Sequence, residues 1–532
     1  MSLANRITLP FALFSLVLLA ACGTNNNGVS GNNEGFTAAN LTGTYVFSSQ
    51  GFDAEASPLN LAGAFAANGS GGITGGTLDA IDPEVAIATN QTITSGSYFV
   101  NTDGRGQVQL VSAAGTFVLD FVLTSGSAGA STHGSVTEFD GNGSGSGTLD
   151  LQTAIAAQSD IAGPYAFSLA GSDESFNPLA SAGAFALNAS GTITQGVEDF
   201  NDDGELFLNE SPSGSAILAS GTSPGTMTLS SVFGLTFDFY PIDTTHFKVV
   251  ETDGANTMSG DVFTQTGASI PNGPVAFTME GEITTNTIAD GGVAISDGTG
   301  NFSSGLEDLS NGTIQSGQIS FSGASAPGGS VGGRVLVNLT GFVPATQWAI
   351  YPSSGGLLML ETDSLNITIG AAYAQTSGAT LSTTQGYGFN LSAFNNTSEA
   401  EYLENDIAEF ASETNAYSGA MDINDDTGDG TDLSTAQAFG VTFTGPDSTG
   451  RGTATTTLAG SAYVDFNFYL VDDSTALVLE TDQNQIGTGV FGLQTSAGSA
   501  VAGRAVHTMA RPVHARASKK AKQLKKNQGR FN

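Results

Sequence analysis

The chain has 532 residues and a formal net charge of −36, from 50 Asp and Glu against 14 Lys and Arg. All the carboxylates lie between Cys22 and Arg504, together with only four cations, so this part should repel nucleic acid and anionic lipid head groups. We therefore expect no nucleic-acid partner. The 71 glycines, and 33 Phe against a single Trp, favour many tight turns between short strands.

The N-terminus has the pattern of an export signal. Arg6 precedes an apolar run of about eleven residues that ends at Leu19. This run is shorter than the roughly 20 residues of a transmembrane helix, and it fits the apolar region of a secretory signal. Cys22 follows directly after two alanines and is the only cysteine of the chain. No intramolecular disulfide is possible, which favours another use for this thiol.

The segment Leu19-Ala20-Ala21-Cys22 resembles the lipobox of bacterial lipoproteins. The resemblance implies that residues 1–21 are a signal peptide, that Cys22 is lipidated, and that the mature protein is anchored to a membrane through this lipid. Gly23 stands where the family's inner-membrane retention signal has Asp, which implies an extracytoplasmic protein of the outer membrane or cell surface. The alternative is an ordinary secretory signal in which Cys22 is incidental. The following Gly- and Asn-rich stretch predicts a flexible tether over residues 22–40.

Four landmarks recur in four copies along the rest of the chain. They are an aromatic-x-Phe strand start, a Gly-x-x-Asp, a Glu-x-Asp and a Gln-Thr, and the Glu lies fourteen residues before the Gln in every copy. In chain order the landmarks begin at Tyr45, Gly76, Glu138 and Gln152; at Tyr165, Gly196, Glu251 and Gln265; at Val275, Gly305, Glu361 and Gln375; and at Tyr387, Gly419, Glu480 and Gln494. The period of 110–120 residues exceeds that of a solenoid or propeller unit and matches a whole domain.

We therefore predict four tandem domains at 41–157, 158–268, 269–379 and 380–497. Apolar residues alternate with polar ones in short runs separated by Asn-Gly and Asp-Gly pairs, which is typical of hairpin-linked strands. The expected fold is all-β, with about eight strands in an antiparallel meander per domain. We expect each meander to close as an up-and-down barrel, because closure removes exposed edges, with a sandwich as the alternative. Short linkers predict a rod-like or loosely bent string.

The body of the chain also resembles uncharacterised tandem-repeat lipoproteins of soil bacteria, and this resemblance implies no activity.

The C-terminal end of the chain differs in composition from the repeats. Residues 498–532 hold nine of the 14 Lys and Arg and no acid. This pattern predicts a disordered basic tail. The alternative is a basic arm for anionic glycans, lipopolysaccharide or the acidic body of the protein.

The stretch from Asp199 to Glu210 matches the EF-hand loop pattern. Asp199, Asn201, Asp203 and Glu210 occupy ligand positions, and hard oxygen ligands at this spacing suit Ca²⁺. The residues before the loop read as a strand, whereas an EF-hand has helices on both sides. A β-hairpin turn is therefore the favoured interpretation, with a Ca²⁺ site as the alternative and no other cofactor expected.

Glu-x-Asp places two carboxylates on one strand face, as an acid and base pair would be placed. Four identical active sites are less plausible than one structural motif used four times, and His133 and His246 have no partners at zinc spacing. We therefore expect no enzyme and name no catalytic residue.

Each repeat holds one cation. Three of them are arginines that precede the Glu-x-Asp of their own repeat by roughly thirty residues. Because strands close in sequence lie close in a meander, and because a guanidinium pairs bidentately with a carboxylate, we predict structural pairs. The predicted pairs are Arg105–Glu138, Arg334–Glu361 and Arg451–Glu480. In repeat 2, Lys248 lies on the strand face opposite Glu251, so no such pair is expected there.

These features favour a lipid-anchored surface protein that displays four β modules for adhesion, envelope structure or contact with a surface glycan or another envelope component. The alternatives are a carrier with a small apolar ligand in a barrel, a Ca²⁺-binding surface module, and a hydrolase without identifiable residues. A carrier needs a cavity of roughly 300 Å³ or more, so the filling of the barrels distinguishes it from the first class.

Overall fold

The computed structural model describes residues 35–494 apart from 55–56, 127–128, 220–221, 255, 284–285, 312–318, 327–330, 343–345, 396–401, 414–415, 427–430 and 483–484. The predicted signal peptide, Cys22 and the predicted basic tail lie outside the described residues. Where the chain is described, no helix combines the length and the apolar character needed to cross a membrane.

The first repeat, barrel 1, is a curled nine-stranded antiparallel sheet in the order β4-β3-β2-β1-β9-β8-β7-β6-β5. An isolated bridge between Gly72, directly before β3, and Ser97 of β5 spans its seam. A short helix, η1 (Ala38–Asn40), precedes the sheet. Its strands are β1 (Thr42–Asp53), β2 (Pro58–Asn68), β3 (Ile73–Asp82), β4 (Ala86–Thr92), β5 (Ser95–Val100), β6 (Arg105–Val111), β7 (Thr116–Gly126), β8 (Ser131–Glu138) and β9 (Gly143–Leu151).

Barrel 2 follows the helix η2 (Gln158–Ile161) and closes through a pairing of β11 with β12, with β13 as a hairpin extension. Its strands are β10 (Gly163–Ser172), β11 (Pro178–Leu187), β12 (Thr192–Asp202), β13 (Glu205–Glu210), β14 (Ser213–Ile217), β15 (Gly225–Ser230), β16 (Gly234–Pro241), β17 (His246–Glu251) and β18 (Thr257–Thr264).

Barrels 3 and 4 are closed antiparallel barrels in which each strand pairs with its neighbours in the chain and the last strand pairs with the first. Barrel 3 consists of β19 (Asn272–Ile283), β20 (Asn286–Asp297), β21 (Phe302–Ser310), β22 (Ile319–Ser325), the helix η3 (Val331–Gly333), β23 (Val335–Thr340), β24 (Gln347–Ser353), β25 (Gly356–Glu361) and β26 (Asn366–Ala374). Barrel 4 consists of β27 (Gly386–Asn395), β28 (Tyr402–Glu413), β29 (Ala416–Asp426), β30 (Thr431–Thr444), β31 (Arg451–Leu458), β32 (Ser461–Asp472), β33 (Thr475–Glu480) and β34 (Gln485–Leu493).

The predicted all-β fold of tandem antiparallel barrels is confirmed. Side chains fill the barrel interiors, as the period-2 alternation requires. In barrel 4 the ring of Phe389 lies 6.2 Å from that of Phe410, 6.0 Å from that of Phe439 and 5.7 Å from that of Phe466. All four rings belong to one buried cluster. Each of the other three barrels has its own buried cluster.

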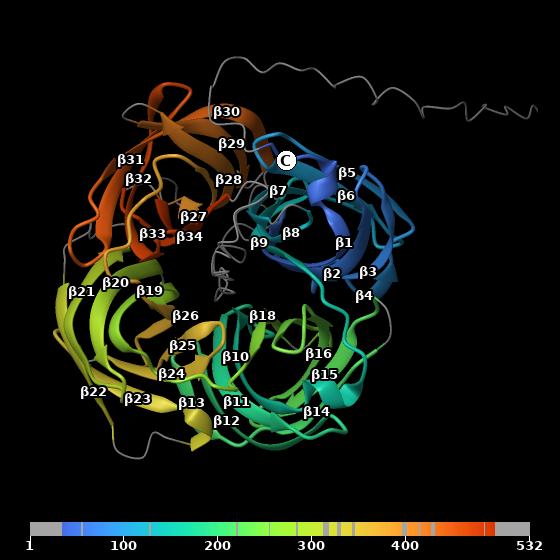
Figure 1. Ribbon diagram of the computed structural model, residues 1–532. Helices are drawn as coiled ribbons and strands as arrows, with labels where there is room; N and C mark the ends of the chain where they lie inside the picture. The colour runs from blue at the N-terminus through green and yellow to red at the C-terminus, as the bar shows by residue number, and fades with distance from the viewer. Residues whose placement is uncertain are drawn as a thin grey trace, which may run out of the picture.

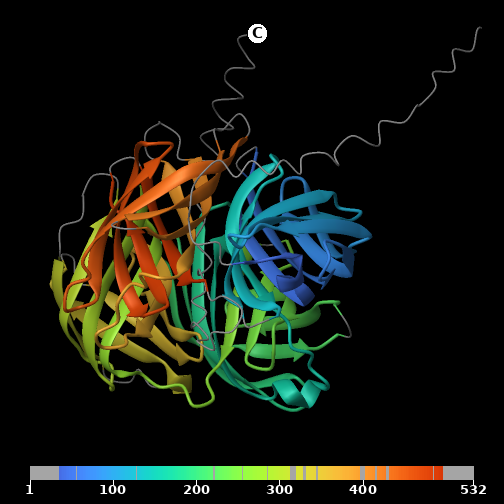
Figure 2. The same cartoon turned by 45° about the horizontal axis from the view of Figure 1, so that its top comes forward.

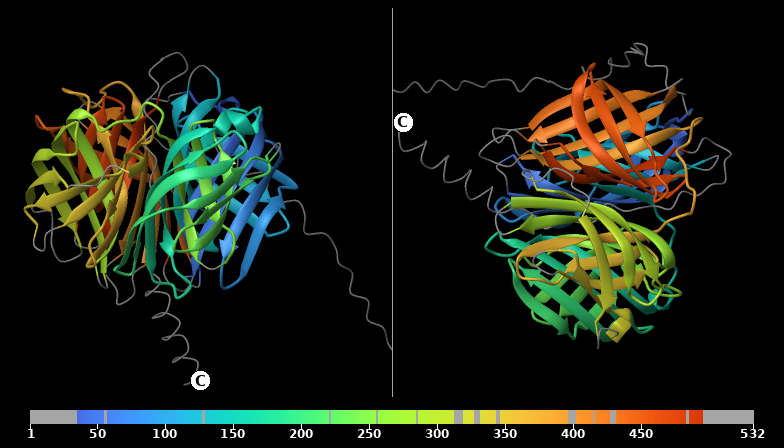
Figure 3. Two further views of the ribbon diagram at one scale, coloured as in Figure 1. Left: turned by 90° about the horizontal axis from the view of Figure 1, so that it is seen from below. Right: turned by 90° about the vertical axis from the view of Figure 1, so that its left-hand side faces the viewer.

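The four barrels form a ring in which each lies beside the next and barrel 4 lies beside barrel 1 (Figure 1). The turned views keep the same order of neighbours (Figures 2 and 3). The expectation of a rod-like or bent string is therefore wrong. The strands that the barrels turn toward each other carry a second set of buried apolar clusters, which a string would leave exposed.

Close packing inside a barrel limits the residue that can stand at Gly183 on β11. A Cβ atom there would lie 2.4 Å from the Phe167 ring and 2.7 Å from the Val197 carbonyl oxygen. We expect Gly183→Ala to lower the free energy of unfolding by about 1–3 kcal/mol, as overpacking does. Gly234→Ala is the control, because nothing lies within 4 Å of its added Cβ. Equal urea midpoints for the two variants would contradict this account of the packing.

Candidate functional site at the junctions between barrels

Four contacts between neighbouring barrels, here called junctions 1–2, 2–3, 3–4 and 4–1, repeat one geometry. In each, the first strands of one barrel pack against the last three strands of the next. At junction 2–3, for example, β10 and β11 contact β24, β25 and β26. At junction 4–1 the same strands of barrel 4, β27 and β28, contact β7 and β8 of barrel 1. The ring is thus closed by one head-to-tail interface used four times.

Small residues on one side of a junction meet large ones on the other. At junction 2–3, Ala182 and Ala184 face Tyr351 and Leu358 in one buried cluster. At junction 1–2, Ala62 and Ala64 share a cluster with Tyr240. Alanines on an outward strand face allow the two sheets to approach closely, and the buried area stabilises the contact.

The glutamine of every Gln-Thr landmark crosses a junction. Its Nε2 donates to a backbone carbonyl at the same position of the next barrel, with distances between 2.7 and 3.1 Å. The pairs are Gln152 to Pro241, Gln265 to Pro352, Gln375 to Leu470 and Gln494 to Leu123. The last pair joins barrel 4 to barrel 1. The Gln-Thr landmark can be recognised in the sequence, but its role cannot. The glutamine donates to a backbone carbonyl, and every residue type has one.

The aspartate of every Gly-x-x-Asp landmark also binds the next barrel. At junction 2–3, Arg334 Nε and Nη2 lie 2.5 and 2.7 Å from the two carboxylate oxygens of Asp199, and Tyr351 donates to the same group at 2.5 Å. Asp199 and Arg334 are both buried, so this ion pair is shielded from solvent.

Junction 3–4 repeats this arrangement almost unchanged. Arg451 Nε and Nη2 lie 2.6 and 2.8 Å from the oxygens of Asp308, and Tyr469 donates to it at 2.7 Å. At junction 4–1, Arg105 Nη1 lies 2.8 Å from Asp422 Oδ2 and also pairs with Asp103. The sequence alone does not identify Tyr240, Tyr351 and Tyr469 as junction residues, although each lies two strands before the Gln-Thr of its repeat.

The predicted pairs Arg105–Glu138, Arg334–Glu361 and Arg451–Glu480 are therefore wrong. The arginines lie on outer barrel faces, whereas the glutamates point inward. Glu480 pairs in register with Phe466, and Glu361 with Trp348, and both of these aromatic residues belong to barrel cores. The wall of a barrel separates its inner from its outer face. An arginine on the outer face therefore cannot pair with a glutamate on the inner face, even when the two lie on nearby strands.

The predicted Ca²⁺ loop is a β-hairpin between β12 and β13. Asp203 and Gly204 both have positive φ, 46° and 89°, as a type I′ turn requires. Two of its predicted ligands are engaged elsewhere: the Asp199 carboxylate binds Arg334 of barrel 3, and Asn201 Oδ1 accepts from the Gly204 N–H at 3.1 Å. The Asn201 Nδ2 donates to three carbonyls of barrel 3, including Asn366 at 2.8 Å. Within the described residues, no group of three His, Cys, Asp or Glu could hold a metal ion. The structure thus places Asp199, Asn201, Asp203 and Glu210 on a hairpin and does not bring them together as ligands of one Ca²⁺ ion.

Asn201 instead caps the turn after the Glu-x-Asp of the next barrel, where it bonds the carbonyls of Glu361 and Asp363. Asn424, which follows Asp422 as Asn201 follows Asp199, does the same at junction 4–1, with bonds to the carbonyls of Glu138 and Gly143. Gly-x-x-Asp and Glu-x-Asp therefore meet across the barrel boundary.

The four Glu-x-Asp glutamates are buried at equivalent places inside the barrels. Burial raises the pKa of Glu251 to about 9 and that of Glu361 to about 8, and the following aspartate adds to each shift. Burial also raises the pKa values of Glu138 and Glu480 well above their usual range. Burial therefore favours the neutral acid form of these groups, which fits a structural role inside each barrel.

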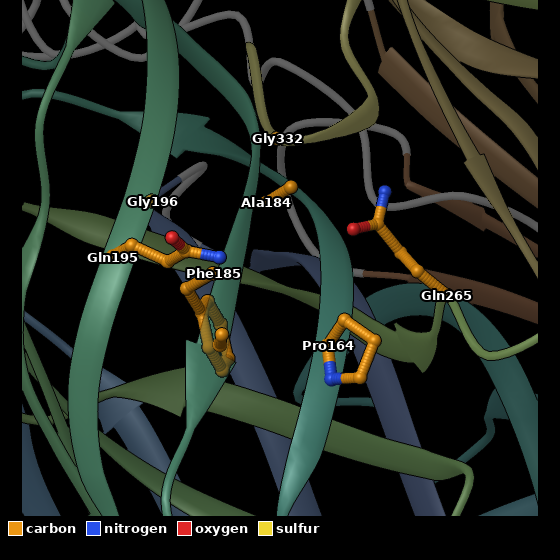
Figure 4. Close-up of a pocket in the computed structure, with 8 residues that line it drawn as sticks. Pro164, Ala184, Phe185, Gln195, Gly196, Gln265 and Gly332 are labelled. Atoms are coloured by element: carbon orange, nitrogen blue, oxygen red, sulfur yellow. The ribbon is translucent and has the colours of Figure 1, made fainter.

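A small cavity lies at junction 2–3 beside Pro164, Gln195, Gln265 and Gly332 (Figure 4). Its volume is about 110 Å³, well below the roughly 300 Å³ of an ordinary ligand pocket. Together with the side chains that fill the barrels, this volume disfavours a carrier with its ligand at this place.

Comparisons with known proteins identify no relative by sequence: no family model and no curated protein matches the chain. Among solved structures, the chain is similar to a double mutant of the vaccine antigen transferrin binding protein B from Haemophilus parasuis Hp5, with 9% identity and a TM-score of 0.17 over 70% of this chain and 85% of that one. It is also similar to intact Ap-TbpB, with 11% identity and a TM-score of 0.17 over 68% and 84%.

A third similar structure is kievitone hydratase from Nectria haematococca, with 10% identity and a TM-score of 0.16 over 65% of this chain and 93% of that one. TM-scores this low support no conclusion about function. The contacts at the junctions, rather than these likenesses, therefore indicate the role of the recurring residues.

Removing one partner of the ion pair at junction 2–3 should strongly lower the stability of the protein. We expect Arg334→Met to lower the free energy of unfolding by about 3–5 kcal/mol, because Asp199 stays buried without its counter-charge. The double variant Arg334→Met, Asp199→Leu should recover most of this loss. Urea unfolding of both variants tests the pair, and an unchanged midpoint for Arg334→Met would refute it.

The buried glutamates predict a stability that falls as the pH rises. The folded pKa of Glu251 lies above the unfolded value of about 4.5, so the folded state holds a proton that the unfolded state has lost. The contribution of Glu251 to the free energy of unfolding should be fully present below pH 4.5 and should fall by up to about 1.4 kcal/mol per pH unit toward pH 9.

Glu251→Gln should reduce this slope, and the exposed Glu205→Gln should not. Thermal unfolding between pH 4 and 9 measures the difference. A slope that is the same in both variants would show that Glu251 ionises freely in the fold.

Proposed function

We propose that the protein is a lipid-anchored ring of four β-barrels at the outer membrane or cell surface, with an adhesive or envelope-structural role rather than an enzymatic one. The observation that carries this proposal is the use of the recurring polar residues. The aspartates and glutamines that mark each repeat bind the neighbouring barrel, and the glutamates lie inside the barrels. The recurrence of these residues in all four repeats is therefore explained by the structure of the ring.

The charge distribution supports a particular kind of partner. The four cations of the repeats are held in ion pairs within the ring: Arg105, Lys248, Arg334 and Arg451. The ring therefore presents carboxylates without compensating cations, and such a surface repels anionic polymers. A neutral glycan or a cationic envelope component fits this surface better than an anionic glycan or nucleic acid.

The lipid anchor at Cys22 is supported by the lipobox-like segment before it. We expect Cys22→Ser to release the protein from membranes or to leave it unprocessed, because several acyl chains hold a protein on a bilayer far better than none. Thr24→Ser is the matched control. Membrane fractionation and the mass of the mature N-terminus measure both effects. A Cys22→Ser variant that fractionates and migrates like the wild type would refute the anchor.

The contact role is tested separately with residues 35–503, an array of neutral, cationic and anionic envelope glycans, and a panel of small apolar ligands. Binding restricted to neutral or cationic glycans would support the proposal. Preferential capture of anionic glycans, or of a small apolar ligand, would contradict it.

A further inference from the structure

Junction 1–2 differs from the other three at the position of the arginine. Arg451 pairs in register with Tyr469, and Arg105 with Val122 at the equivalent place. In barrel 2, Gly225 pairs with Phe239, so Pro224 lies opposite Tyr240. Proline thus replaces the cation that balances the aspartate at each of the other junctions.

The aspartate at junction 1–2 is Asp79, which is fully buried. Its Oδ2 accepts from the Tyr240 hydroxyl at 2.8 Å, and its Oδ1 accepts from the backbone N–H of Asn90. Asp238, on the same strand as Tyr240, adds a second negative charge nearby. Where the structure describes the chain, no ion pair links Asp79 to a cation.

The other charged groups at this junction pair with carboxylates other than Asp79. Lys248 Nζ lies 3.2 Å from Asp261 and 3.8 Å from Asp150 of barrel 1. His133 contacts Asp150 at 2.7 Å, and His246 contacts Asp261 at 2.6 Å. These groups form a cluster of their own beside the Asp79–Tyr240 contact.

We propose that junction 1–2 is the pH-sensitive joint of the ring: it is held closed while Asp79 carries a proton, and it loosens when that carboxyl ionises. Burial raises the pKa of Asp79 to about 7, and the backbone N–H of Asn90 offsets only part of this shift. In the open junction the same carboxyl meets water and regains an ordinary pKa near 4. At the other junctions an arginine pairs with the aspartate, so we expect those contacts to stay closed over the same range.

The direction of the effect depends on the two pKa values. Between about pH 4 and pH 7 the closed junction holds a proton that the open one has lost, so each pH unit favours opening about tenfold. Above pH 7 both states are ionised and the effect levels off. Asp238, whose burial raises its pKa to about 6, acts in the same direction. Opening would uncover the apolar cluster of Val46, Ala64 and Tyr240 and leave the ring held at three junctions.

Hydrogen exchange of three amides that bond across junctions tests this proposal. Thr153 bonds Ile242 at junction 1–2, Ser354 bonds Thr264 at junction 2–3, and Thr376 bonds Val471 at junction 3–4. In the full-length chain with Cys22→Ser, the protection factor of Thr153 should fall about 100-fold from pH 5 to pH 7. Those of Ser354 and Thr376 should change less than tenfold.

Three variants isolate the cause. Asp79→Asn, which cannot ionise, should remove most of the pH dependence of Thr153 protection and leave only the smaller effect of Asp238. Pro224→Arg should do the same by supplying the missing cation. Arg334→Met should transfer the pH dependence to Ser354. A common pH dependence of the three amides in the wild type would overturn the proposal. So would an unchanged pH dependence of Thr153 in both Asp79→Asn and Pro224→Arg.

Discussion

An outward-facing carboxylate on the third strand of each barrel is the constraint on which the ring depends. Asp79, Asp199, Asp308 and Asp422 stand on barrel walls, where an isolated barrel would expose them to water. In the ring they are buried, and a buried carboxylate is costly unless donors satisfy it. Arginine and tyrosine of the next barrel supply those donors at junctions 2–3 and 3–4, arginine at 4–1 and tyrosine at 1–2. Each barrel therefore needs a neighbour on one side and serves as one on the other.

This dependence of each barrel on a neighbour favours an arrangement in which the fourth barrel meets the first and the four form a ring. A head-to-tail interface repeated along a chain either continues as a filament or returns to its start. Here the fourth copy meets the first, since Gln494 reaches Leu123 and Arg105 reaches Asp422. The same interface holds the four cations of the repeats in ion pairs. The surface of the described ring is consequently anionic, and burial favours the neutral form of the glutamates inside the barrels.

Much of the fold could be predicted from the sequence, because it depends on local patterns. The alternation at Tyr387 and Phe389, and the fixed spacing from Glu480 to Gln494, are enough to predict repeated antiparallel barrels. The partners of the polar landmarks could not be predicted in this way. Arg334 is far closer in sequence to Glu361 than to Asp199, yet the barrel wall separates it from the first and the ring places it against the second. Ring closure is a property of the whole chain and leaves no mark within one repeat.

The most direct test of the ring is its size in solution. Four barrels of about 115 residues, each with a radius of gyration near 13 Å, should give a radius of about 25 Å when packed as a ring. The same barrels in a row should give about 40 Å. Small-angle X-ray scattering from residues 35–494 distinguishes these values. A radius near 25 Å is the result predicted here, and a radius near 40 Å would contradict the closed ring.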